Sequence, residues 1–305
     1  MKLVLLLLLV ALLGAEGWRA DSWKLQIAED TSFTKKMEYL AEVTAMTSDL
    51  EHTGAETFDE HLLGVQAILR RWGADEAVAD AGLFHSIYGT EGFQGFKLPL
   101  SSRLHMQGLL GARAERLAWI FCMVDRSTVD ASLYASYGTG DSAYTFTSRA
   151  ELGRFPIHLS GESEWLDFIE LSLADWLEQV EGAATKENPL FRWKVGEAWA
   201  YRRQAYHKMA QILQIRGSED ARLRRTVATK MLEEIFGEEP QDTRHLHQER
   251  TPPVSEAAKD AQEALRSALL EGEEGGGDWE EAWAVGGEMG VRVEEVGVGA
   301  GGEEA

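Results

Sequence analysis

The chain has 305 residues, a formal net charge of −21 and a single cysteine, Cys122. One cysteine excludes an intramolecular disulfide, so an apolar core or a metal must hold the fold, and the chain is long enough to bury a sizeable core. The negative charge argues against nucleic acid and anionic membrane surfaces as partners, because like charges repel.

Residues 1–17 are typical of a secretory signal peptide. Lys2 supplies a positive start, residues 3–13 form an unbroken apolar run, and small residues follow up to Gly17. The run is shorter than the roughly 20 apolar residues of a membrane-spanning helix. We therefore expect cleavage after Gly17, a secreted or endomembrane-lumen location, and no stable membrane insertion of the mature protein. An uncleaved anchor and an organelle transit peptide are the alternatives.

Apolar residues recur at helical spacing over residues 23–237, which predicts one mainly α-helical domain. Gly73 is expected to end the first helix, and Asp75 and Ser163 to open two later ones as N-caps. The expected helices cover 58–72, 76–85, 102–125, 163–180, 195–214 and 218–236.

Little else in this domain has a regular pattern. Residues 143–147 are the best candidate for a short strand, and loops are expected over 87–101 and 131–160. Aromatic residues at helical spacing over 165–206 predict core packing. A substrate pocket lined by these rings is the alternative.

Residues 238–305 are predicted to follow the domain as a linker, a possible short helix over 254–270, and a tail. The tail, 271–305, has eleven acidic residues, one arginine and eleven glycines, and so carries about half of the net charge. It has no apolar period and cannot bury enough surface to offset its ordering entropy, so we expect it to be disordered.

Three potential metal ligands fall on three different predicted helices: His61, His85 and Asp125. Imidazole and carboxylate groups bind divalent Zn, Fe or Mn, and three protein ligands leave positions open for water and substrate. Each residue alone is more typical of a hydrogen-bonded helix position or an ion pair. The prediction of a divalent metal (Mn, Fe or Zn) therefore depends on their joint occurrence.

The flanks of these residues resemble the HD superfamily of metal-dependent phosphohydrolases, in particular the branch that hydrolyses (p)ppGpp. The resemblance lies in three stretches: His61-Leu-Leu-Gly-Val-Gln-Ala-Ile-Leu69, Ala81-Gly-Leu-Phe-His85-Ser86, and Met123-Val-Asp-Arg-Ser127. It implies an HD-domain-like helical bundle, a metal held by the three ligands, and a phosphate ester or nucleotide-like small molecule as substrate. Arg126 would then steady the anionic substrate or pair with its neighbouring aspartate.

One residue departs from the superfamily pattern. Ser86 stands where the superfamily has the aspartate that follows the second histidine. A hydroxyl is a weak neutral ligand, so a two-metal site is in doubt, and Glu91 is a hypothetical replacement carboxylate. Tyr88 either orients a substrate phosphate or water, or packs as an ordinary aromatic.

The string His85-Ser-Ile-Tyr-Gly-Thr-Glu91 also resembles the hallmark of a family of helical domains in plants, algae and bacteria whose function is not established. The expected function is a metal-dependent hydrolase of a small anionic molecule. Two alternatives stay open: a non-catalytic ligand- or protein-binding module on a decayed HD scaffold, and an iron-dependent oxygenase.

Overall fold

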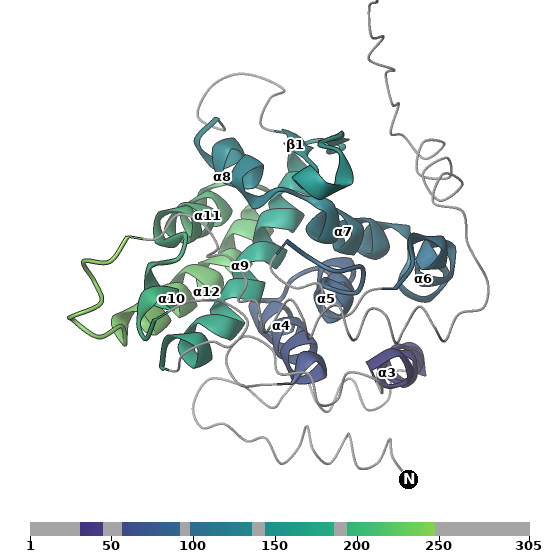
Figure 1. Cartoon of the computed structure of the whole chain (residues 1–305), viewed down its shortest axis with the longest axis horizontal. Coiled ribbons are helices and arrows are strands. Elements are labelled where there is room, and N and C mark those ends of the chain that lie inside the picture. The colour runs from purple at the N-terminus through teal and green to yellow at the C-terminus, as the bar shows by residue number, and fades with distance from the viewer. Residues whose placement is uncertain (1–30, 45–56, 92–97, 136–143, 186–193, 248–305) are drawn as a thin grey trace, which may run out of the picture.

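The computed structural model describes residues 31–44, 57–91, 98–135, 144–185 and 194–247. These residues form ten α-helices and one two-stranded sheet, which confirms the mainly helical prediction (Figure 1). The helices are α3 (Thr31–Thr44), α4 (Phe58–Trp72), α5 (Glu76–Phe84), α6 (Arg103–Leu110), α7 (Ala112–Met123), α8 (Arg126–Ala135), α9 (Glu162–Thr185), α10 (Glu197–Ala200), α11 (Arg203–Ile215) and α12 (Glu219–Gly237). The strands are β1 (Thr145–Thr147) and β2 (Pro156–His158), and two short 3-10 turns cover Leu100–Ser102 and Ala150–Leu152.

Local signals place the ends of α4 and α5 as the sequence predicted. The Thr57 backbone N–H donates to Glu60 Oε2 at 2.8 Å, half of a capping box at the start of α4. Gly73 ends that helix in the left-handed conformation, with φ of 71°, which glycine adopts at little cost. Asp75 then opens α5 by accepting a hydrogen bond from the Ala77 backbone at 3.1 Å.

The single helix predicted over 102–125 is wrong, because it is two helices. Gly111, with φ of 86°, breaks the segment between α6 and α7. After α7 the chain turns again and enters α8, which lies partly in the segment predicted to be a loop. Asp125 therefore lies in the turn between α7 and α8 and not at the end of one long helix.

Helix α9 runs through the centre of the molecule (Figure 1) and contacts α4, α5, α7, α10, α11 and α12. Its apolar side chains up to Val180 are buried, among them Trp165, Phe168 and Trp176. The predicted aromatic block is therefore core, and Trp176 stacks on Tyr206 of α11 with ring centroids 5.2 Å apart. Because α4 and α5 both pack on this central helix, polar residues on the shared faces meet in the interior.

The small sheet supports the junction between α7 and α8. Phe146 of β1 pairs with Ile157 of β2, and both side chains are fully buried. The Asp125 backbone N–H donates to the Thr147 carbonyl at 2.9 Å, which ties the junction to β1.

Packing continues beyond the domain end predicted at residue 237. Glu239 forms an ion pair with Arg203 of α11, and both Glu239 and Thr243 are buried. The expected signal peptide (1–17) and the possible helix and acidic tail (254–305) lie outside the described residues. Within the described part of the chain, none of the helices combines the length and apolarity needed to cross a bilayer.

Candidate metal centre

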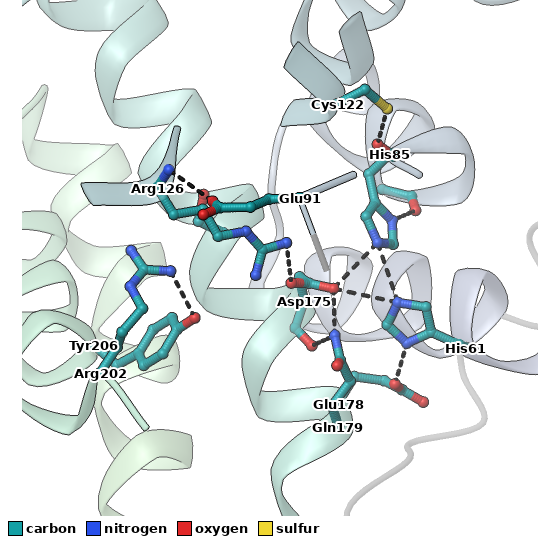
Figure 2. Close-up of polar contacts among 12 residues, drawn as sticks. His61, His85, Glu91, Cys122, Arg126, Asp175, Glu178, Gln179, Arg202 and Tyr206 are labelled. Carbon is teal, nitrogen blue, oxygen red and sulfur yellow. Dashed lines mark hydrogen bonds and ion pairs between the residues drawn. The ribbon is translucent and has the colours of Figure 1, made fainter. Parts of the chain in front are cut away.

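Three buried side chains from three helices converge on one point (Figure 2): His61 of α4, His85 at the end of α5, and Asp175 of α9. The two histidine Nε2 atoms are 3.1 Å apart. Asp175 Oδ1 lies 3.2 Å from His61 Nε2 and 3.1 Å from His85 Nε2. The three atoms thus form a nearly equilateral triangle, and within the described ranges this is the group of acidic, histidine or cysteine side chains close enough to share a metal.

Further hydrogen bonds fix the orientation of each member of the triangle. His61 Nδ1 lies 2.5 Å from Glu178 Oε2, and His85 Nδ1 lies 2.8 Å from the Gly82 carbonyl oxygen. Gln179 donates to Asp175 Oδ1 at 2.6 Å. Carboxylate and carbonyl partners on the remote histidine nitrogen are the usual outer contacts of metal-binding histidines, because they direct Nε2 at the ion.

The Gly82 carbonyl determines the tautomer of His85. A carbonyl only accepts, so Nδ1 of His85 carries the proton and Nε2 presents a lone pair. Burial lowers the pKa of His85, with the Asp175 contact opposing that effect, so the ring is neutral near pH 7. Its Nε2 lone pair then faces the Asp175 carboxylate at 3.1 Å, and two acceptors at this distance require a cation between or beside them.

A proton is one such cation. Burial alone would lower the pKa of His61, but the Glu178 and Asp175 carboxylates outweigh it and raise the pKa to about 10. Burial would also raise the pKa of Asp175, but both histidines and Arg126 hold it well below its usual range. Without a metal, the centre therefore contains a protonated His61 beside an ionised Asp175.

A divalent metal is the other cation that fits the three atoms. Ligands about 2.0–2.2 Å from one ion and roughly at right angles to each other are about 3 Å apart. The separations of 3.1 and 3.2 Å match this spacing. Two imidazoles and one carboxylate are also a donor set that Zn, Fe and Mn accept. The residues present therefore fit a single divalent ion.

The carboxylate that joins the two histidines is that of Asp175 and not that of the predicted Asp125. The Asp125 carboxylate accepts hydrogen bonds from Ser127, at 2.9 Å from the backbone nitrogen and 2.6 Å from Oγ. Its other oxygen pairs with Arg154 at 3.3 Å. The chain turns after α7, and Asp125 caps the start of α8, so its carboxylate is not part of the buried cluster.

Glu91 and Tyr88 also lie outside the triangle. Glu91 Oε2 accepts the Arg126 backbone N–H at 3.0 Å, so it caps α8 and does not replace the missing carboxylate after His85. The Tyr88 hydroxyl donates to the buried Glu115 at 3.0 Å. This bond ties the turn after His85 to α7, which matches the packed-aromatic interpretation and not substrate orientation.

Arg126 does lie beside the centre, as predicted. Its Nη2 is 3.8 Å from Asp175 Oδ2, and its guanidinium lies over the Phe121 ring, 5.1 Å from the centroid. The two oxygens of Asp175 therefore face different groups: Oδ1 faces the histidines and Oδ2 faces Arg126 (Figure 2).

Cys122 is not a member of the triangle. Its thiol donates to the His85 carbonyl at 3.0 Å, and burial raises the pKa of the thiol to about 12.

Sequence reasoning assigned no site role to Asp175 and Glu178. The two residues are one helical turn apart on α9, with Trp176 and Leu177 between them, in a stretch that is mostly apolar. Acidic residues in a fully apolar helical stretch are rarely buried without a partner. An acidic residue at such a position is therefore the sequence signal that was available. It points to Asp175 and Glu178 but not to the histidines that they contact.

Residues 40–126 match a family described as a domain of unknown function, DUF6817. The matched segment includes His61, His85 and Arg126 and ends before α9, so Asp175 lies outside it. No curated protein and no solved structure matches the chain. The chain is thus similar, over the segment that supplies both histidines, to a family with no assigned function.

Proposed function

We propose that the protein is a metal-dependent hydrolase with one divalent ion at His61, His85 and Asp175, acting on a small phosphate ester. The observation that carries the proposal is the fixed lone pair of His85 Nε2, which faces Asp175 Oδ1 at 3.1 Å. A fold that required only packing would place an apolar residue there at lower desolvation cost.

The three ligands use two neutral groups and one charged group, and therefore leave a bound divalent ion with net positive charge. Such an ion lowers the pKa of water toward about 7 and polarises a phosphoryl oxygen. Glu178 and the Gly82 carbonyl keep both imidazoles aimed at the ion. The burial of His61 and His85 excludes bulk solvent and strengthens electrostatic interactions at the centre.

The test measures metal-dependent turnover of a panel of small phosphate esters by the full chain. Protein treated with chelator is reloaded separately with Mn²⁺, Fe²⁺ or Zn²⁺. Turnover should require one of these ions and should be lost in Asp175→Asn, with Asp125→Asn as the matched control that keeps it. A folded protein that binds no metal after supplementation would contradict the proposal and favour a binding module on a decayed scaffold.

An iron-dependent oxygenase is the second candidate, because two histidines and one carboxylate with open positions are also the ligand set of non-haem iron oxygenases. The observation that favours this candidate is the buried cluster of His61, His85 and Asp175, which offers this donor set. Oxygen uptake by the Fe²⁺-loaded protein, absent with Mn²⁺ or Zn²⁺, would support it. Phosphate release with no oxygen uptake would support the hydrolase.

A further inference from the structure

Asp175 and Arg126 line a small cavity. Figure 2 shows that Arg126, Arg202 and Tyr206 lie on one side of Asp175, across the carboxylate from the histidines. Phe121 and Phe168 lie on the apolar side of the cavity. Its polar lining comes from Arg126, Ser172, Asp175, Arg202 and Tyr206. The free space has room for about one water molecule. The cavity therefore shares one wall, Asp175, with the proposed metal centre.

Two of the polar groups that line this cavity can donate hydrogen bonds, Tyr206 and Arg126. Arg202 is held by Asp130, with Nε 2.9 Å from Oδ2, and its Nη1 donates to the Tyr206 hydroxyl at 3.0 Å. The Tyr206 oxygen therefore acts as an acceptor on the Arg202 side and must direct its own proton elsewhere. Burial raises the pKa of Tyr206, so the phenol keeps that proton at physiological pH.

The second donor is the guanidinium of Arg126. Its closest acidic partner within the described residues is Asp175 Oδ2 at 3.8 Å, longer than a hydrogen bond. The Arg126 side chain is 19% exposed, so it can move toward solvent. Ser172 does not add a donor, because its hydroxyl proton goes to the Phe168 carbonyl at 2.8 Å.

We propose that this cavity is an oxyanion subsite in which Tyr206 and Arg126 bind one oxygen of the phosphoryl group of the substrate. The proposal rests on the proposed function and extends it, because it names the substrate group and the residues that select it. Donors on one side and apolar rings on the other suit a group that only accepts hydrogen bonds. Arg202 is a positioning residue, because it acts through the Tyr206 hydroxyl.

The shared wall couples this subsite to the metal. Without a metal, the Asp175 carboxylate repels an anion in the cavity and attracts Arg126, which then fills part of the space. A divalent ion held by His61, His85 and Asp175 would offset the carboxylate charge, and Arg126 could then turn from Asp175 Oδ2 to the anion. Metal and anion therefore increase each other's affinity, and the coupling is reciprocal.

The experiment measures binding of inorganic phosphate to the full chain by equilibrium dialysis, with Mn²⁺ or with chelator, after Mn²⁺ stoichiometry has been determined. Mn²⁺ should tighten phosphate binding by about tenfold or more. Tyr206→Phe should weaken phosphate binding by roughly tenfold or more at unchanged Mn²⁺ stoichiometry, because a hydrogen bond to a charged group is lost. Tyr88→Phe is the matched control: it also removes a buried hydroxyl, outside the cavity, and should bind phosphate normally.

Arg126→Gln is a second variant, in which Mn²⁺ affinity and phosphate affinity should not fall together. Removing the cation next to Asp175 should leave Mn²⁺ affinity equal or higher while phosphate binding falls. If the protein binds Mn²⁺, either of two results would overturn the subsite and leave the metal centre intact. One is equal phosphate affinity with Mn²⁺ and with chelator, and the other is equal phosphate affinity of Tyr206→Phe and Tyr88→Phe. Absence of Mn²⁺ binding would instead overturn the proposed function.

Discussion

The orientation of a single ring decides what the buried centre can bind. His85 donates through Nδ1 to the Gly82 carbonyl, so its Nε2 carries no proton and can only accept a hydrogen bond or bind a cation. His61 differs because both of its nitrogens face carboxylates, Glu178 and Asp175. His85 therefore always presents a lone pair on Nε2, and under the proposed function His61 would exchange its proton for a metal.

This difference predicts proton release on metal binding. In the metal-free protein, burial opposes protonation of His61 but the Glu178 and Asp175 carboxylates outweigh it, and its pKa is about 10. A metal must displace that proton, so binding near pH 7.5 should release about one proton and tighten roughly tenfold per pH unit between about pH 6.5 and 8.5. Isothermal titration calorimetry in buffers of different ionisation enthalpy counts the protons. Affinity independent of pH across this range would contradict the assignment.

At the scale of the elements, α4 can approach α9 closely because a glycine faces Glu178. A Cβ atom at Gly64 would lie 2.5 Å from Glu178 Oε1 and 2.8 Å from its Cγ, distances that packed atoms do not tolerate. The same close approach allows Glu178 to reach His61 Nδ1. The missing side chain at Gly64 thus contributes to the geometry of the centre.

Gly64→Ala should therefore displace Glu178 from His61 and weaken metal affinity by roughly 10- to 100-fold, the usual effect of losing an outer partner of a metal-binding histidine. Gly108→Ala in α6 is the matched control, because nothing lies within 4 Å of a Cβ atom there. It should keep wild-type metal affinity and stabilise the helix by about 0.5–1 kcal/mol. Equal metal affinity in the two variants, by competition with a chromophoric chelator, would refute the positioning role.

The elements also show how far sequence reasoning reaches. His61 and His85 were predictable because α4 and α5 are consecutive helices with clear caps, and a short connection places their inner faces together. The third member of the cluster was not, because Asp125 caps α8 after the turn and only tertiary packing brings Asp175 of α9 to the histidines. The aromatic block was recognisable as core, whereas the acidic residues within it had no local sign of their partners.

On the scale of the whole molecule, a metal at this centre would link α4, α5 and α9. The chain has no disulfide to do so, since its single cysteine is buried and free. A ligand that binds only the folded state stabilises it by mass action. The metal is thus expected to stabilise the fold as a crosslink between helices, in addition to its proposed catalytic role.

Mn²⁺ at about 100 times its Kd should add about 2.7 kcal/mol to the free energy of unfolding and raise Tm by roughly 5–10 °C. Differential scanning calorimetry with Mn²⁺ and with chelator measures the difference. His85→Ala should lose the metal-dependent shift. An equal shift in this variant would mean that the ion binds elsewhere.

The most direct test of the centre is the metal content of the purified chain and two isosteric variants, Asp175→Asn and Asp125→Asn, determined by elemental analysis after loading and dialysis. Asp175 and Asp125 compete for the role of third ligand, and only Asp175 faces both histidines. We expect about one equivalent of transition metal in the wild type and in Asp125→Asn, and a loss of most of it in folded Asp175→Asn. Metal retained by Asp175→Asn, or lost from Asp125→Asn, would contradict the account.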